Sequence, residues 1–247
     1  MIGLSIDKAA EWLASGHLVA IPTETVYGLA GNALDAGVVA GIFELKRRPY
    51  FDPLIVHLSR AADLAAYAHD IPPPAWELAT RFWPGPLTLL LPRKPVIPDL
   101  ATAGLPRAGF RVPAHPMAQA LLGRLPFPLA APSANPFGGI SPTTAAHVAS
   151  QLPNVPYVLD GGPCALGLES TIVGFAPGKA VVYRLGALPL EALREALPGV
   201  ELEVLPHSTS RPAAPGMLER HYAPRIPLRL ASYEEALALA RPGQDGW

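Results

Sequence analysis

Hydroxyl, carboxyl and basic side chains are crowded between two apolar runs near the start of the sequence. The segment Thr23 to Thr25 directly follows the apolar run 18–22, and α/β sheets place ligand-binding loops at such strand ends. The basic run Lys46 to Arg48 ends a predicted helix, and the next apolar run, 54–58, carries His57. Basic residues at a helix end often only complement the helix dipole. Their place beside two strand ends instead favours a basic cleft for a ligand.

A second polar loop follows the short apolar strand 128–132. Ser133 and Asn135 lie at its carboxyl end, and two glycines allow the backbone to approach a ligand closely. Ser141-Pro142 then predicts a helix start whose amides point back into the loop, an arrangement that can hold phosphate. The same residues are also ordinary turn formers, so both interpretations stay open.

The remaining polar positions and the missing motifs narrow the chemistry. Glu169 to Thr171 lead a predicted strand, and Arg184 lies near the end of the next one, where an isolated arginine is usually a surface residue. The sequence contains no G-x-x-x-x-G-K-[ST], G-x-G-x-x-G, HExxH, paired CxxC or G-x-S-x-G. Motifs alone therefore predict an α/β protein with a basic, glycine-lined cleft.

Short apolar runs alternate with helical patterns along the chain, which predicts an α/β fold. Ser5 and Asp35 are the expected N-caps of the first two helices. The predicted strands are 18–22, 54–58, 86–92, 109–112, 128–132, 157–162, 167–175, 179–188 and 200–205, and the predicted helices are 5–15, 35–45, 59–69, 72–83, 115–122 and 189–197.

The amino-acid composition and net charge limit the classes of protein to which this chain can belong. Of the 247 residues, 50% are hydrophobic and 16% are charged, which is enough to build a real core. The net charge of −1 gives no global basic field of the kind that a dedicated nucleic-acid binder carries. No apolar run reaches the roughly 20 residues of a membrane span, and the start of the chain lacks a signal-peptide pattern, so we expect a cytoplasmic protein without membrane contact. The single cysteine, Cys164, has no partner for an internal disulfide.

The polar segments together resemble a known family. PTETVYGL at 22–29 followed by KRRPYFDPLIVH at 46–57 is similar to the YrdC-type domain of threonylcarbamoyl-AMP synthases. The SAN and ISPT segments after the strand at 128–132, the ESTIV segment at 169–173, and MLERHYAP at 217–224 match further motifs of that family. Asp52 stands where the family usually has asparagine, Arg107 where threonine is usual, and Phe137-Gly138 where a Ser-Gly pair is typical.

The resemblance implies a fold and a reaction. The fold would be a YrdC-like twisted sheet of mixed parallel and antiparallel strands, flanked by helices around a basic concave cleft. The reaction would join L-threonine, bicarbonate and ATP into threonylcarbamoyl-adenylate and pyrophosphate, with Mg²⁺ accompanying ATP, for the threonylcarbamoyladenosine modification of tRNA. The implied partners are downstream tRNA threonylcarbamoyl-transfer proteins and, weakly, tRNA itself.

The resemblance also implies roles for individual positions. Lys46 and Arg48 would be catalytic and face the phosphates. Threonine would be bound by Thr25, with Thr23 as the alternative, and by His57, Arg111, the Ala131 backbone and Ser170. ATP would be contacted by Lys46, Arg48, Asp52, Arg107, Ser133, Asn135, Ser141, Arg184 and Tyr222.

A Pro-rich segment divides the predicted domains. Residues 1–205 would form the catalytic domain, and 206–225 a linker that closes over the cleft as a lid. Longer members of the family continue into a second α/β domain, so we expect 226–247 to be a truncated or vestigial remnant of it.

Two other functions compete with this one. An RNA-binding module without catalysis is disfavoured by the near-zero net charge and by the lack of aromatic residues among the basic segments. A carbamoyl-transfer domain of the hydrogenase-maturation type is disfavoured because acylphosphatase and zinc-finger segments are absent from this sequence.

Overall fold

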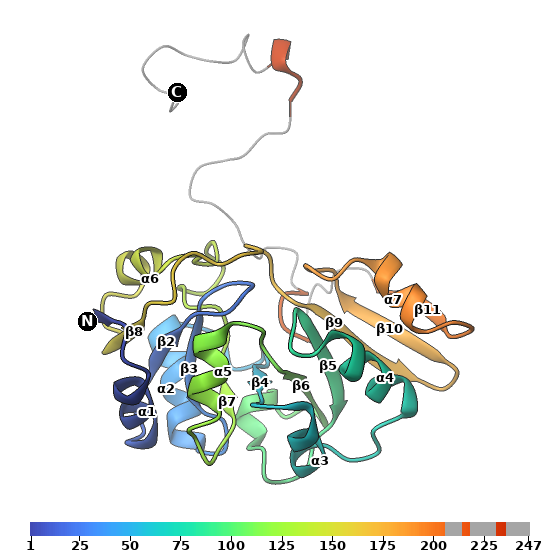
Figure 1. Ribbon diagram of the computed structural model, residues 1–247, viewed down its shortest axis with the longest axis horizontal. Coiled ribbons are helices and arrows are strands. Elements are labelled where there is room, and N and C mark those ends of the chain that lie inside the picture. Colours follow the sequence, from blue (N-terminus) through green and yellow to red (C-terminus); the bar gives the residue numbers. More distant parts are fainter. Residues whose placement is uncertain (206–213, 218–230, 236–247) are drawn as a thin grey trace.

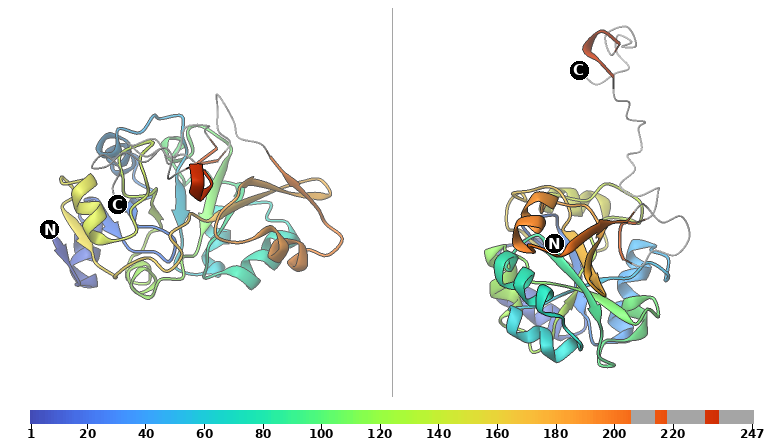
Figure 2. Two further views of the ribbon diagram at one scale, coloured as in Figure 1. Left: turned by 90° about the horizontal axis from the view of Figure 1, so that it is seen from above. Right: turned by 90° about the vertical axis from the view of Figure 1, so that its right-hand side faces the viewer.

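The computed structural model describes residues 1–205, 214–217 and 231–235 of the chain. Eleven strands of these residues form one sheet in the order β1-β8-β2-β3-β7-β4-β6-β5-β9-β10-β11. Figure 1 shows the sheet running from β8 beside the N-terminus to β10 and β11 at the opposite end, and the views in Figure 2 show its twist. The strands are β1 (Ile2–Gly3), β2 (Val19–Ile21), β3 (Gly28–Asn32), β4 (Ile55–His57), β5 (Leu87–Pro92), β6 (Arg107–Arg111), β7 (Leu129–Ala130), β8 (Tyr157–Leu159), β9 (Thr171–Ala176), β10 (Lys179–Arg184) and β11 (Glu201–Val204).

Strand pairing confirms the predicted mixed sheet. Neighbours β4 and β6 run parallel, as do β5 and β9, whereas β7 pairs antiparallel with both β3 and β4. The register places His57 beside Arg111, at the carboxyl ends of β4 and β6. Two residues far apart in sequence therefore meet at one edge of the sheet.

Helices cover the sheet and end beside the polar loops. The helices are α1 (Ile6–Ala14), α2 (Ala36–Lys46), α3 (Leu64–Tyr67), α4 (Pro73–Phe82), α5 (Pro116–Leu122), α6 (Ala145–Gln151) and α7 (Leu190–Ala196), with 3-10 turns at Ala61–Asp63 and Asp99–Thr102. The predicted caps are confirmed, because Ser5 Oγ accepts the Lys8 amide at 3.1 Å and Asp35 Oδ1 accepts the Gly37 amide at 2.8 Å. Buried Val39, Ile42 and Phe43 pack α2 against the main core, which fixes Lys46 at its end.

Three sequence predictions of local structure were wrong. The expected helix 59–69 is a 3-10 turn followed by the single turn α3, because Ser59 Oγ donates to Asp63 Oδ2 at 2.6 Å rather than capping a helix. The helix expected to start at Ser141 begins at Ala145, where Thr144 accepts the His147 amide. The strand expected from 167 begins at Thr171, so Glu169 and Ser170 belong to the preceding loop.

Candidate functional site

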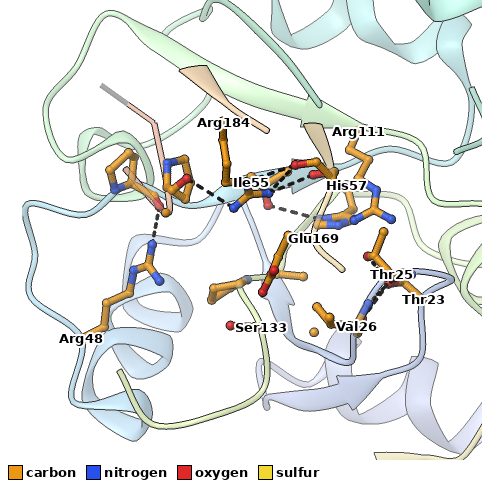
Figure 3. Close-up of a pocket in the computed structure, with 17 residues that line it drawn as sticks. Thr23, Thr25, Val26, Arg48, Ile55, His57, Arg111, Ser133, Glu169 and Arg184 are labelled. Atoms are coloured by element: carbon orange, nitrogen blue, oxygen red, sulfur yellow. Dashed lines mark hydrogen bonds between the residues drawn. The ribbon is translucent and has the colours of Figure 1, made fainter. Parts of the chain in front are cut away.

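A pocket opens where the carboxyl ends of β4 and β6 meet the turn after β2 and the loop after β7. Figure 3 shows Arg48 on one side of it, Thr25 and Arg111 on the other, and Glu169 between them. Its walls are formed by Thr23, Thr25, Val26, Gly28, Arg48, Pro53, Ile55, His57, Arg111, Ala131, Pro132, Ser133, Glu169, Ser170, Arg184, Pro215 and Gly216.

The five predicted threonine-binding residues all lie in this wall: Thr25, His57, Arg111, Ala131 and Ser170. Thr23 is there too, but its hydroxyl is engaged by the turn itself. Thr23 Oγ1 donates to the Val26 carbonyl at 2.6 Å and lies 2.8 Å from Thr25 Oγ1. A hydroxyl has one proton, so Thr25 donates to Thr23 and offers its own lone pairs to the pocket. The geometry therefore favours Thr25 over Thr23 as the ligand contact.

Arg111 is held by a buried acidic residue. Its Nη2 donates to Glu24 Oε1 at 2.6 Å, and its Nε donates to the Gly85 carbonyl at 3.3 Å. The second carboxylate oxygen of Glu24 accepts the Ala114 amide at 2.9 Å. Burial lowers the pKa of Arg111, and Glu24 opposes that shift. The guanidinium is thus fixed in orientation, with its remaining N–H groups available toward the pocket.

His57 is uncharged at neutral pH. Its Nδ1 lies 3.2 Å from the Ile55 carbonyl, which can only accept, so Nδ1 carries the proton. Burial, followed by the charge of Arg111, lowers the pKa of His57 to about 3. In this site His57 can act as a neutral hydrogen-bonding group.

Arg48 lines the opposite wall and is anchored by the loop after α2. Its Nε donates to the Asp52 carbonyl at 3.0 Å, and its Nη2 donates to the Pro53 carbonyl at 2.8 Å. Nη2 also lies 2.9 Å from Asp52 Oδ2, in an ion pair whose geometry does not make a hydrogen bond. Burial raises the pKa of Asp52, while Arg48 counteracts it. Asp52, predicted to contact ATP, is fully buried behind Arg48 and does not line the pocket.

Lys46 supports the second polar loop from behind. Its ammonium group donates to the Ser133 carbonyl at 2.5 Å and to the Asn135 carbonyl, and only 1% of the residue is exposed. Burial, together with the charge of Arg48, lowers the pKa of Lys46. Asn135 is buried as well, with Nδ2 bonded to the Gly139 carbonyl at 2.9 Å. Of this group only Ser133 reaches the pocket wall, so the structure places Lys46 and Asn135 behind it.

Arg184 joins three segments at the top of the pocket. Its Nη2 donates to the Ser170 carbonyl at 2.8 Å, and its Nη1 donates to the Pro215 carbonyl at 3.3 Å. Ala214 and Met217, on either side of this contact, are buried in an apolar cluster with Ile55, Leu90 and Ile172. This packing holds Pro215 and Gly216 in place as part of the pocket wall.

Two predicted ATP contacts lie elsewhere. Arg107 begins β6, at the opposite end from Arg111, and its Nη1 lies 3.4 Å from the Tyr183 hydroxyl outside the pocket. The prediction placed it by position in the motif, but a strand of five residues separates its ends by roughly 13 Å. Tyr222 lies outside the described residues.

The sequence predictions gave no individual role to two acidic residues at this site, although the family resemblance implies that the segment 169–173 faces the ligand. Glu24 holds Arg111, and Glu169 lines the pocket with Oε1 accepting the hydroxyl proton of Ser141. That contact is also where the structure places Ser141. A signal was present in the sequence for Glu24, which lies between Thr23 and Thr25 directly after a strand, whereas Glu169 is flanked by Leu168 and Ser170.

The described ranges contain neither a cluster of metal-ligating side chains nor a helix that could cross a membrane. Within them no group of three or more His, Cys, Asp or Glu side chains is placed to hold a metal ion. Across the same ranges, no helix combines the length and apolar character that a membrane crossing requires.

Comparison with known proteins identifies the family. A model of the Sua5, YciO and YrdC proteins, described as "Telomere recombination", matches residues 11–186. This chain belongs to the Sua5/YciO/YrdC family. A second model, described as "Threonylcarbamoyl-AMP synthase, C-terminal domain", matches residues 188–244. The predicted domain boundaries at 205 and 225 stay a prediction.

Relatives within the Sua5/YciO/YrdC family are similar over most of this chain. It is 45% identical to a threonylcarbamoyl-AMP synthase of Pyrococcus abyssi, over 89% of this chain and 65% of the relative. It is 41% identical to that of Bacillus subtilis, over 91% of this chain and 66% of the relative. The crystal structure of P. abyssi Sua5 complexed with L-threonine matches with a TM-score of 0.85 and 44% identity, over 89% of this chain and 65% of that one. The chain thus spans about two thirds of the length of these relatives.

Proposed function

We propose that this chain is an enzyme, an L-threonylcarbamoyladenylate synthase of the nucleotidyltransferase class, acting on L-threonine, bicarbonate and ATP. The observation that carries the proposal is the pocket itself. One wall offers a fixed arginine, Arg111, beside hydroxyl groups, and the other offers Arg48 beside Ser133. A carboxylate suits the first wall and phosphate suits the second. The names of the relatives and the threonine complex of P. abyssi Sua5 support the same substrates.

The chemistry requires two anions to react with each other. A carbamate oxygen, formed from the threonine amine and bicarbonate, attacks the α-phosphorus of ATP, and pyrophosphate leaves. Arg48 and Arg184 supply positive charge that offsets the repulsion and stabilises the charge on the leaving group. Pro215 and Gly216 cover part of the pocket and reduce the access of water to the labile mixed anhydride.

Lys46 contributes to phosphate binding by holding the Ser133 to Asn135 loop in place. The buried ammonium bonds two carbonyls of this loop and fixes where Ser133 lies. A loop held in this way needs little reorganisation when phosphate binds. We therefore assign Lys46 to positioning the phosphate-binding loop, whereas Arg48 faces the phosphates directly.

We propose that Mg²⁺ binds together with the nucleotide. Mg²⁺ is commonly bound through one or two carboxylates together with substrate phosphates, and the described residues provide no acidic cluster for it. The substrate is then the Mg²⁺ complex of ATP. Downstream tRNA threonylcarbamoyl-transfer proteins and weak contact with tRNA belong to the same proposal, as does the cytoplasm, where these substrates meet.

The test is direct detection of the product. The purified chain is incubated with ATP, ¹³C-bicarbonate and L-threonine, and the quenched mixture is analysed by mass spectrometry. We expect threonylcarbamoyl-adenylate that carries one ¹³C atom. A chain that produces only ADP or AMP would contradict the proposal.

A further inference from the structure

Glu169 places a carboxylate in the middle of a pocket whose other charged wall residues are arginines. Arg48, Arg111 and Arg184 line the same pocket, and Figure 3 shows Glu169 between Arg48 and Thr25. Burial lowers the pKa of both Lys46 and Arg111, and the negative charge of Glu169 partly opposes that shift in each, so its field reaches both sides of the pocket. A pocket that binds only anions has no use for this group.

The carboxylate is not used to hold the fold together. Its Oε1 accepts the Ser141 hydroxyl proton, which orients the side chain, and no other side-chain contact is recorded for it in the described part of the chain. Among the described residues, no Lys, Arg or His nitrogen forms an ion pair with Glu169. Two arginines of the same pocket instead pair with other acids, Arg48 with Asp52 and Arg111 with Glu24. Glu169 is therefore oriented and partly exposed, with Oε2 open to a ligand that carries N–H groups.

Other groups near the pocket are poor proton acceptors. His57 is held neutral with a pKa of about 3, and its Nδ1 already carries a proton. Glu24 has both oxygens bonded, one to Arg111 and one to the Ala114 amide. Lys46 is a buried hydrogen-bond donor to two carbonyls. Among the described residues that line the pocket, this leaves Glu169 as the one carboxylate base.

We propose that Glu169 is the proton acceptor for carbamate formation, an inference that rests on the proposed function. Threonine enters as an ammonium ion and gives one proton to bicarbonate, whose C–O bond breaks to yield water and CO₂. The nitrogen lone pair then forms the C–N bond, and a C=O electron pair moves onto oxygen. The nitrogen is now positive and carries two protons, of which Glu169 takes one. The carbamate that remains has a neutral N–H nitrogen and an anionic oxygen, and this oxygen attacks the α-phosphorus.

The experiment separates carbamate formation from adenylyl transfer. Forward synthesis from ATP, threonine and bicarbonate needs both steps, whereas ATP formation from threonylcarbamoyl-adenylate and pyrophosphate needs only adenylyl transfer. Both directions are measured for Glu169→Gln, for Glu169→Asp, and for Glu77→Gln, a matched control on the exposed face of α4.

In Glu169→Gln we expect forward synthesis to fall by roughly 100-fold or more, the usual contribution of general acid–base catalysis, with the reverse reaction close to wild type. The forward deficit should shrink as the pH rises, because solvent base replaces the lost carboxylate. Glu169→Asp should recover part of the forward rate, and Glu77→Gln should change neither direction. Near wild-type reverse activity also shows that the variant folds.

Three results would overturn the inference. Equal losses of forward and reverse activity in Glu169→Gln would place Glu169 in adenylyl transfer. Restoration of forward synthesis by excess Mg²⁺ would make Glu169 a metal ligand. An unchanged forward rate would show that Glu169 has no role in catalysis. A wild-type chain that fails forward synthesis with all three substrates would instead contradict the proposed function. The two failures are therefore distinguishable.

Discussion

Glu24 and Arg111 form a buried ion pair that links the turn after β2 to the end of β6, with Arg111 Nη2 2.6 Å from Glu24 Oε1. The side chains are 11% and 5% exposed, so the pair is shielded from water. The two residues are 87 positions apart, and neither is placed by local sequence alone. The pair sets the direction in which the guanidinium faces the pocket.

Arg111 should determine threonine affinity. We expect Arg111→Ala to weaken threonine binding by about 1.5 to 3 kcal/mol, the range for a charge-assisted hydrogen bond. Because the substitution also leaves Glu24 buried without its partner, at a cost of roughly 3 to 5 kcal/mol of stability, Arg111→Lys is the companion variant. Calorimetric titration with threonine and with ATP checks this, and equal losses for both ligands would contradict it.

Glu24 should act through Arg111 rather than by touching the ligand. Glu24→Gln keeps the shape and one hydrogen bond but removes the charge that orients the guanidinium. We expect the KM for threonine to rise while the KM for ATP stays near wild type, with Glu77→Gln as the surface control. A change in the KM for ATP alone would show that Glu24 serves the other wall.

Arg48 and Lys46 should affect turnover more than threonine binding. Arg48→Ala removes positive charge where the leaving pyrophosphate develops charge, and Lys46→Ala releases the loop that carries Ser133. We expect kcat to fall in both variants with threonine affinity retained. Steady-state kinetics together with threonine titration checks this, and full activity in both would show that the basic run only ends α2.

His57 should make stability depend on pH. Its pKa is about 3 in the folded protein and near the ordinary 6.5 when unfolded, so the unfolded state binds more protons between these values. The stability that His57 contributes is therefore complete above about pH 6.5 and is lost as the pH falls toward 3, by up to about 4 to 5 kcal/mol. Urea unfolding from pH 7 down to pH 4 should show a shallower pH slope for His57→Gln. Equal slopes would mean that His57 is solvated.

The segment around Pro215 should retain the product. Ala214 and Met217 are buried beside the pocket, and Pro215 and Gly216 form part of its wall. A chain ending at Leu205 should still fold, since all eleven strands of the sheet precede that point. It should lose threonylcarbamoyl-adenylate to water faster than the full chain, as measured by the rate of product hydrolysis. Equal retention in both chains would make the segment a tether only.

The sequence predicted the mixed sheet, and it named residues near strand ends that line one pocket, whereas their contacts with threonine stay a prediction. Apolar runs located most strands, and the residues expected to bind threonine follow directly at strand ends. Strand β3 was missed because its sequence, GLAGN, is rich in glycine and reads as a loop.

The other side of the site depends on long-range packing. In the sequence Lys46 looks like an ordinary basic residue at the end of a helix. In the structure its ammonium group donates to the carbonyls of Ser133 and Asn135, 87 and 89 positions away. Arg107 lies in the right motif but at the wrong end of its strand. The role of Glu169 depends on Ser141 and on three arginines from separate elements, which no spacing along the chain reveals.

Pyrophosphate release with each substrate omitted in turn tests the central claim most directly. The attacking oxygen exists only after threonine and bicarbonate have formed a carbamate, so the account predicts release only when ATP, threonine and bicarbonate are all present. The assay is run with CO₂ removed from the buffers, and carbonate is added back to restore the rate. Equal release without threonine or without bicarbonate would contradict the account and leave a pocket that only hydrolyses ATP.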